Sequence, residues 1–291
     1  MKLILSHSQG NANVRATAIS FADADLLQEF HTSIACFPGS VLDALGGINF
    51  LSEVRRRGFD KRLKKFTHTS PIKEMGRLFS LKANFSKLTA PETGIFCVDA
   101  VIQGLDRKVA YGLKKAINRG ADGVYAYEDG AEFLFREAKR LGLQNFYDLP
   151  TGYWRAKLRI LAAEKKRYPE WQSTIRGLID SDEKLMRKDE EIKMADRIFV
   201  ASKFTASTLS DFSGSLPPVQ IIPYGFPPVS SAKKYDTKNG KLPIKLLFVG
   251  NLSQQKGIAD LFKAVDALGK KVSLTLVGRK PTNDCEALNS A

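Results

Sequence analysis

Apolar residues along the chain occur in short runs that alternate with stretches of helical spacing, and the pattern is clearest over Ile244–Gly278. The apolar run Ile244–Val249 predicts a buried strand that ends at Gly250. Apolar residues then recur at helical spacing, and the run Val272–Val277 predicts a second strand. A strand, a tight turn, a helix and a strand form one βαβ unit of a parallel sheet.

The preceding part of the chain repeats this alternation. Its pattern predicts strands at Lys2–Ser6, Ser33–Phe37, Gly123–Tyr127, Asn145–Asp148, Arg197–Ala201 and Val219–Ile222. Helices are predicted over 14–26, 99–117 and 133–141, and a charged helical stretch over 156–194 is expected to expose its charges on a solvated face. Such alternation predicts an α/β fold with a parallel sheet and helices on both faces.

A linker separates the two parts. Residues 223–243 are rich in Pro, Ser and Gly and poor in core-forming residues. We therefore predict a Rossmann-like domain over 1–222, a linker over 223–243 and a second, incomplete domain over 244–291. The first is expected to be self-contained. A single βαβ unit leaves apolar strand surface exposed, so the second is expected to be poorly ordered in isolation.

Charge and cysteine usage narrow the function classes. The 291-residue chain has a formal net charge of +14, which favours an anionic partner such as a nucleotide, a membrane surface or a nucleic acid. No nucleic-acid module accompanies the charge, so nucleic acid is not expected. The three cysteines lie far apart without metal-ligand spacing, which suits a reducing cytosol. The first residues have too short an apolar run for a signal peptide, and we expect a cytoplasmic protein.

The segment 55–66, RRRGFDKRLKKF, is the most basic stretch of the chain. Seven of its twelve residues are Arg or Lys, and Phe59, Leu63 and Phe66 are interleaved with them. A solvated loop and helix face is the simpler interpretation. A segment of this kind can also lie on the anionic inner face of a membrane, which makes a peripheral membrane contact the alternative.

The turn after the strand Ile244–Val249 has the features of an anion site. Unpaired N–H groups at the start of the next helix favour a negative charge, and Lys256 adds a full positive charge there. Gly250 can equally serve only a tight turn, and Lys256 can be a solvated residue. The turn is not G-x-G-x-x-G, so the dinucleotide fingerprint is absent.

Two segments carry a family resemblance. FVGNLSQQKGIADLFKAV, followed by LTLVG, resembles the opening of the donor domain in the retaining family 4 glycosyltransferases, and ADRIFVASKFTASTL with VQIIPYGF resembles the passage between their two domains. The resemblance implies a GT-B-like α/β fold of two Rossmann-like domains. It also implies transfer of a sugar from a nucleotide-sugar to a hydroxyl of a glycan or lipid-linked acceptor, with retention and without a metal or other cofactor.

The resemblance also assigns donor-binding residues. It implies that Gly10, in the loop after the first strand, faces the donor phosphates, and that Gly250, Asn251, Lys256 and Gly257 hold the diphosphate. Relatives often place an arginine where this chain has Asn251, so the electrostatic contribution at that position is expected to be weaker.

On the acceptor side the chain departs from the family. The strand end that often carries a histidine reads YAYEDGA here, so Tyr127, Glu128 and Asp129 occupy the catalytic place. A carboxylate there can accept a proton, whereas Asp129 is explained more economically as a helix N-cap. Further on, Tyr153, Trp154 and Arg155 can stack on a sugar and hold an anion, or can be packing residues. His7 is expected to be a hydrogen-bonded structural residue.

The donor-site glutamates of the family would lie beyond the last residue of this sequence. The resemblance therefore implies a truncated member that is expected not to turn over a nucleotide-sugar. The alternatives are a non-catalytic protein that binds an anionic ligand or a membrane surface, and an inactive fragment.

Overall fold

The computed structural model describes residues 1–40, 56–175, 180–226, 229, 231 and 243–290. These residues form two compact units. The first consists of 1–153 and 181–226, and the second of 154–180 and 227–291. The grouping of 154–180 with the carboxyl-terminal segment was not predicted from the sequence.

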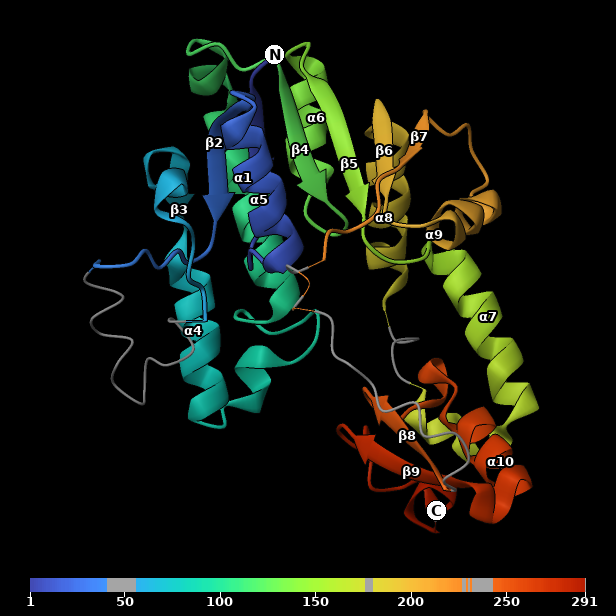
Figure 1. Cartoon of the computed structure of the whole chain (residues 1–291). Coiled ribbons are helices and arrows are strands. Elements are labelled where there is room, and N and C mark those ends of the chain that lie inside the picture. The colour runs from blue at the N-terminus through green and yellow to red at the C-terminus, as the bar shows by residue number, and fades with distance from the viewer. Residues whose placement is uncertain (41–55, 176–179, 227–228, 230, 232–242, 291) are drawn as a thin grey trace. The chain divides into compact units, whose positions relative to one another are not determined.

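The first unit is built on a seven-stranded sheet with the order β3-β2-β1-β4-β5-β6-β7 (Figure 1). Every neighbouring pair of strands is parallel. This order is that of a Rossmann-like sheet, in which the chain reverses its direction of travel between β1 and β4. The strands are β1 (Leu3–Ser6), β2 (Leu27–Thr32), β3 (Thr67–Thr69), β4 (Gly123–Tyr127), β5 (Gln144–Leu149), β6 (Arg197–Val200) and β7 (Val219–Ile221).

Helices cover both faces of this sheet. In Figure 1, α1 lies in front of the strands, whereas α5, α6 and α8 form a layer behind them. The longer helices are α1 (Ala12–Asp23), α4 (Pro71–Lys82), α5 (Val98–Ile117), α6 (Glu132–Arg140) and α8 (Asp182–Met194). The shorter ones are η2 (Lys61–Phe66), η3 (Ser86–Thr89), α9 (Lys203–Thr208) and η5 (Leu209–Asp211).

The apolar pattern explains most of this architecture. β1 and β4 are buried along their whole length because helices pack on both of their faces. Val14 and Ala18 of α1 are fully buried against Leu5 and Phe30. The predicted α/β class is therefore confirmed, with one complete Rossmann-like parallel-sheet domain followed by a further βαβ unit.

The predicted strand at Ser33–Phe37 is wrong, because the second strand is β2, Leu27–Thr32. Polar residues such as Glu29 interrupt the apolar pattern of β2, although its Phe30 is fully buried. The apolar residues after it are buried in a loop, where Cys36 forms only an isolated bridge with Gly58. Apolar content in this stretch reflects burial rather than strand structure.

The prediction of a solvated charged face over 156–194 is also wrong for α8. Lys188, Asp189 and Glu191 are all buried. Each has a partner of the first unit that compensates its loss of hydration, as described below. Helical periodicity alone gives no indication of such partners.

The second unit combines α7 (Trp154–Arg167) and η4 (Pro169–Thr174) with the βαβ segment. That segment contains β8 (Ile244–Val249), η6 (Gln254–Lys256), α10 (Ile258–Leu268), η7 (Gly269–Lys271), β9 (Val272–Val277) and α11 (Glu286–Ser290). β8 and β9 pair in parallel. The core of the unit contains Tyr168, Trp171, Leu252, Ile258 and Leu288.

β8 is not the buried strand that its apolar run predicted. Leu247 is 67% exposed and Val249 is 69% exposed, whereas Leu246 and Phe248 are partly covered. Alternate side chains of a strand point to opposite faces, so only one face of this strand pair is covered within the unit. Among the described residues, none of the helices has both the length and the apolar character that crossing a membrane would need.

The basic segment uses its apolar residues internally. Phe59 and Leu63 are buried in the core of the first unit, so they are not available for insertion into a membrane. Arg57 donates from Nη2 to Glu74 at 2.5 Å. Arg55 lies outside the described residues. What remains on the surface is the charged face of η2, which includes Lys61 and Lys64.

Candidate functional site

The carboxyl ends of β1 and β4 meet at the point where the order of the sheet reverses. Parallel α/β sheets bind ligands in the crevice at such a point. A cavity of about 200 Å³ lies here, and its polar lining includes His7, Gln9 and Glu128, while Ile102 and Leu105 of α5 supply apolar lining. The volume is below the usual range of about 300–1,000 Å³ for ligand pockets, so it suits a small group rather than a whole ligand.

His7 presents a neutral ring to this cavity. Its Nδ1 accepts hydrogen bonds from the backbone N–H of Gln9 at 3.0 Å and of Gly10 at 2.9 Å. Burial, together with the charge of Arg57, lowers the pKa of His7 to about 4. At neutral pH the single proton is therefore on Nε2, and the ring can donate a hydrogen bond. The structure confirms His7 as a hydrogen-bonded residue and adds a place in the cavity lining, which the sequence did not predict.

Gly10 is required by its surroundings. Its φ is +57°, and a Cβ at this position would lie 2.3 Å from Cζ of Phe59. The N–H of Gly10 is already used by His7, so in this conformation it is not offered to a phosphate. Gly10 therefore allows the backbone to pass close to the ring of Phe59.

Glu128 lies at the end of β4 and is enclosed. One carboxylate oxygen is 3.2 Å from Nζ of Lys188, and the other accepts a hydrogen bond from Oγ1 of Thr151 at 3.3 Å. Burial raises the pKa of Glu128, although Lys188 opposes that shift. A carboxylate whose pKa is raised toward neutrality is suited to accepting a proton.

Tyr127 and Asp129 flank Glu128 and have different surroundings. The Tyr127 ring is buried and meets His7 edge-on, with the ring centroids 4.8 Å apart. Burial also raises the pKa of Tyr127. Asp129 has a φ of +74° and lies 3.4 Å from Lys188 and 3.7 Å from Arg187.

The prediction that Asp129 caps the following helix is wrong. The cap residue of α6 is Ala131, which gives no side-chain hydrogen bond. Instead, Asp106 of α5 accepts from the N–H groups of Phe133 and Leu134, and Glu191 of α8 accepts from those of Ala131 and Asp129. Both capping carboxylates come from distant parts of the sequence, so local spacing cannot reveal them.

The three acceptor-side residues divide between the units. Tyr153, in the first unit, is 1% exposed, and its hydroxyl donates to Asp189 at 2.7 Å. It is therefore a packing residue rather than a platform for a sugar ring. Trp154 and Arg155 belong to the second unit, where the guanidinium lies 4.1 Å from the centroid of the indole.

The predicted donor residues Gly250, Asn251, Lys256 and Gly257 lie in one loop of the second unit, between β8 and α10. Lys256 and Asn251 are exposed, and Gly250 and Gly257 have φ values of +156° and +72°. The sequence predicted a tight turn between β8 and α10. Instead, the 3-10 turn η6 lies between them, and α10 begins only at Ile258.

Gln254 is a residue of this loop whose role the sequence did not reveal. Its Oε1 accepts from the N–H of Ala259 at 2.9 Å, and its Nε2 donates to Glu164 at 2.9 Å and to Asp260 at 3.0 Å. The side chain therefore caps α10 and links the loop to α7. A Gln four residues after Gly250 gives no local signal for this role, because the partner on α7 is distant in sequence.

No protein-family model and no curated protein matches the sequence. Among solved structures, the chain resembles a UDP-glucosyltransferase from Polygonum tinctorium capable of glucosylating indoxyl, with 9% identity, a TM-score of 0.42 and coverage of 95% of this chain and 71% of that chain. It also resembles Phytolacca americana UGT2 complexed with UDP-2fluoro-glucose and pterostilbene, at 12% identity, a TM-score of 0.45 and coverage of 94% and 71%. MurG of Acinetobacter baumannii gives 13% identity, a TM-score of 0.28 and coverage of 99% and 68%. At these identities and TM-scores the likeness assigns no activity to the chain.

Proposed function

We propose that this chain is a GT-B glycosyltransferase that binds the diphosphate of a nucleotide-sugar at the loop 250–257 and serves sugar transfer to an acceptor hydroxyl with retention. The observation that carries the proposal is the segment resembling the donor-domain opening of family 4 glycosyltransferases. It folds as β8, η6, α10 and β9, and all of its expected phosphate-binding residues fall in one loop at the carboxyl end of β8. The mechanism requires no metal or other cofactor.

The proposed donor site works by electrostatics. The positive end of α10 and the exposed charge of Lys256 would stabilise the negative charge that develops on the leaving nucleoside diphosphate. The N–H of Ala259 already donates to the side chain of Gln254 and is not offered to a phosphate. Lys256 is therefore expected to contribute most of the attraction to the diphosphate. Asn251, a neutral donor, contributes less than an arginine would.

On the acceptor side we propose Glu128 as the proton acceptor. It lines the cavity at the switch point together with His7, whose Nε2–H can hold an acceptor oxygen by a hydrogen bond. Tyr127 supports the ring of His7, and Asp129 holds Lys188 near Glu128. In this assignment the acceptor is a glycan or lipid-linked hydroxyl.

The donor site is tested by calorimetric titration of the chain with UDP, ADP and GDP. We expect Lys256→Ala to weaken nucleoside diphosphate binding by about 1.5–3 kcal/mol, the scale of a charged hydrogen bond. Lys270→Ala, in η7 beyond the carboxyl end of α10, is the matched control and should leave affinity unchanged. Equal affinity in wild type and Lys256→Ala removes Lys256 from the site, and no binding of any of the three nucleotides overturns the donor site itself.

The acceptor assignment has a separate readout. Glu128→Gln should leave nucleotide affinity unchanged and remove any sugar transfer. A product with the inverted anomeric configuration would overturn retention.

A further inference from the structure

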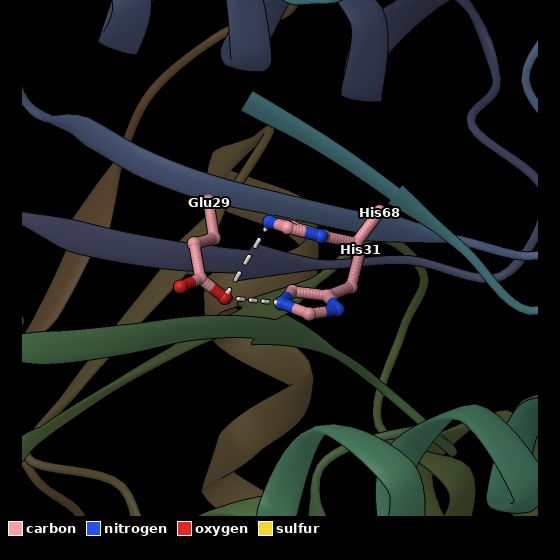
Figure 2. A group of neighbouring side chains, drawn as sticks. All are labelled: Glu29, His31 and His68. Atoms are coloured by element: carbon pink, nitrogen blue, oxygen red, sulfur yellow. Dashed lines mark hydrogen bonds and ion pairs between the residues drawn. The ribbon is translucent and has the colours of Figure 1, made fainter. Parts of the chain in front are cut away.

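Three potential metal ligands share one face of the sheet at its β3 edge. Glu29 and His31 are two residues apart in β2, so their side chains point to the same face. His68 of β3 is the register partner of His31. Figure 2 shows the carboxylate of Glu29 and the two imidazoles converging.

The distances within this cluster suit a small ion. Nε2 of His31 lies 2.7 Å from Oε2 of Glu29, and Nε2 of His68 lies 3.9 Å from the same oxygen. The candidate ligand atoms of the three residues all lie within 4.8 Å of one another. A tetrahedral zinc ion with bonds of about 2.0–2.2 Å needs ligand atoms roughly 3.3–3.6 Å apart. Small side-chain rotations that move the ligand atoms by about 1–2 Å would therefore give the tetrahedral arrangement.

The surroundings prepare the carboxylate for this role. Its other oxygen, Oε1, is paired with Arg119, so Oε2 can bind an ion while Arg119 keeps the carboxylate oriented. Lys108 donates to the backbone oxygen of Thr69 at 3.1 Å and, with Arg119, adds positive charge that limits the affinity.

The two histidines lie side by side, and His68 is open to solvent. The imidazoles are nearly parallel, at 22°, with their centroids 4.9 Å apart. The side chain of His68 is 51% exposed and that of Glu29 is 8% exposed, so an ion can enter from solvent and keep a water ligand.

We propose that Glu29, His31 and His68 bind one divalent transition-metal ion, with Zn²⁺ as the best match to two imidazoles and a carboxylate. The ion would replace the hydrogen bond between His31 and Glu29 and would connect β3 to β2. β3 has three residues and lies at the edge of the sheet, so a metal bridge would fix a short strand that pairs on one side only.

The test uses the chain without an affinity tag that contains histidine. Zn²⁺ and Co²⁺ are titrated by calorimetry and by visible absorption, in which tetrahedral Co²⁺ has an intense spectrum. We expect one ion per chain, and at least tenfold weaker binding in His68→Ala and in Glu29→Gln. Asp25→Asn removes an exposed carboxylate outside the cluster and should leave the affinity unchanged.

Thermal unfolding gives an independent readout. At one Zn²⁺ concentration that saturates the wild type, the Tm of the wild type should rise by mass action and that of His68→Ala should rise less. Mg²⁺ should have no effect in either chain, because imidazole is a poor ligand for it. Equal Zn²⁺ affinity in wild type and His68→Ala, or a Co²⁺ spectrum that does not depend on His68, overturns the proposal. Since His68 is half exposed, its replacement is expected to leave the fold intact.

Discussion

β4 and β8 are both short parallel strands made from apolar runs, yet their environments differ. All five residues of β4 are buried, because helices of the first unit pack on both faces of its sheet. In β8, Leu247 and Val249 are mostly exposed, because the second unit covers only one face of the β8–β9 pair. In these two segments the apolar run predicts the strand correctly, whereas the layers packed on the strand decide how stable it is.

The difference in burial between β4 and β8 can be expressed as a free energy. Complete burial of one large aliphatic side chain contributes about 1.5–3 kcal/mol. Val124 and Ala126 are 0% exposed, while Leu247 is 67% exposed and contributes little in its unit. The second unit must hold its strands with fewer such contributions and with the cluster around Trp171 and Ile258.

The largest expected difference is in hydrogen exchange. Backbone N–H groups of Leu246–Val249 should exchange at least about a thousandfold faster than those of Val124–Tyr127, since β8 opens without unfolding the first unit. Exchange should be measured at two protein concentrations. Comparable protection of both strands would show that β8 opens as rarely as β4. Protection of β8 that grows with protein concentration would show that a second copy covers its open face.

Substitution of one buried and one exposed leucine tests the same contrast. Leu134 lies in α6 and is 0% exposed. Leu134→Ala should lower the free energy of unfolding by about 2–5 kcal/mol. Leu247→Ser should change stability by less than about 0.5 kcal/mol. Both tryptophans, Trp154 and Trp171, lie in the second unit, so fluorescence during denaturation measures Leu247→Ser, and circular dichroism measures Leu134→Ala. A cost for Leu247→Ser as large as that for Leu134→Ala would mean that β8 has a buried partner.

Buried charge gives a pH signature that belongs to the first unit. Burial raises the pKa of Glu191 from 4.5 to about 8. Between these values the folded state binds a proton that the unfolded state has lost, so stability falls as the pH rises. From pH 6.5 to 8 the loss should be up to about 2 kcal/mol. Over this range Asp106, with a pKa raised to about 6, adds little to the slope. His7, with a pKa lowered from 6.5 to about 4, opposes the fall slightly, because its unfolded form still loses a proton just above pH 6.5.

Urea denaturation at several pH values, followed by circular dichroism, measures this slope. Glu191→Gln should flatten it, because the neutral amide no longer titrates but can still accept from a backbone N–H of the α6 terminus. Glu137→Gln replaces a partly exposed carboxylate on α6 and should leave the slope unchanged. An identical slope in wild type and Glu191→Gln would show that another group is responsible.

The smallest expected effect concerns the cap of α10. Gln254→Ala removes the side-chain acceptor of the Ala259 N–H and should cost about 1 kcal/mol in the protection of α10. Asn251→Ala, exposed in the same loop, should cost less than about 0.5 kcal/mol. Hydrogen exchange of the α10 amides measures both. Equal effects of the two substitutions would remove Gln254 from its capping role.

How far the sequence predicts the fold depends on how local the signal is. β4 was predicted at its observed residues, Gly123–Tyr127, because a continuous apolar run there is bounded by glycine and charge. β2 was missed because Glu29 and His31 interrupt its pattern, and their polar side chains are accommodated by each other and by Arg119. Such partners are distant in sequence and appear only after folding.

The candidate sites follow the same rule. The residues of the loop 250–257 are consecutive, so their proximity could be predicted directly. The convergence of His7 with Glu128 depends on β1 and β4 being neighbours, which requires the order of the sheet. The burial of Tyr153 depends on Asp189 and on Phe212. The ring of Phe212 packs edge-on against that of Tyr153, with the ring centroids 5.7 Å apart. No local pattern contains these contacts.

The buried cysteines give each unit its own chemical reporter. Cys97 caps α5 in the first unit, and Cys285 lies in the core of the second, with its sulfur 3.5 Å from the backbone oxygen of Glu170. A thiol reagent can reach either sulfur only when the surrounding structure opens. The labelling rate of each cysteine, resolved by mass spectrometry, would therefore report how often its unit opens in the unmodified protein.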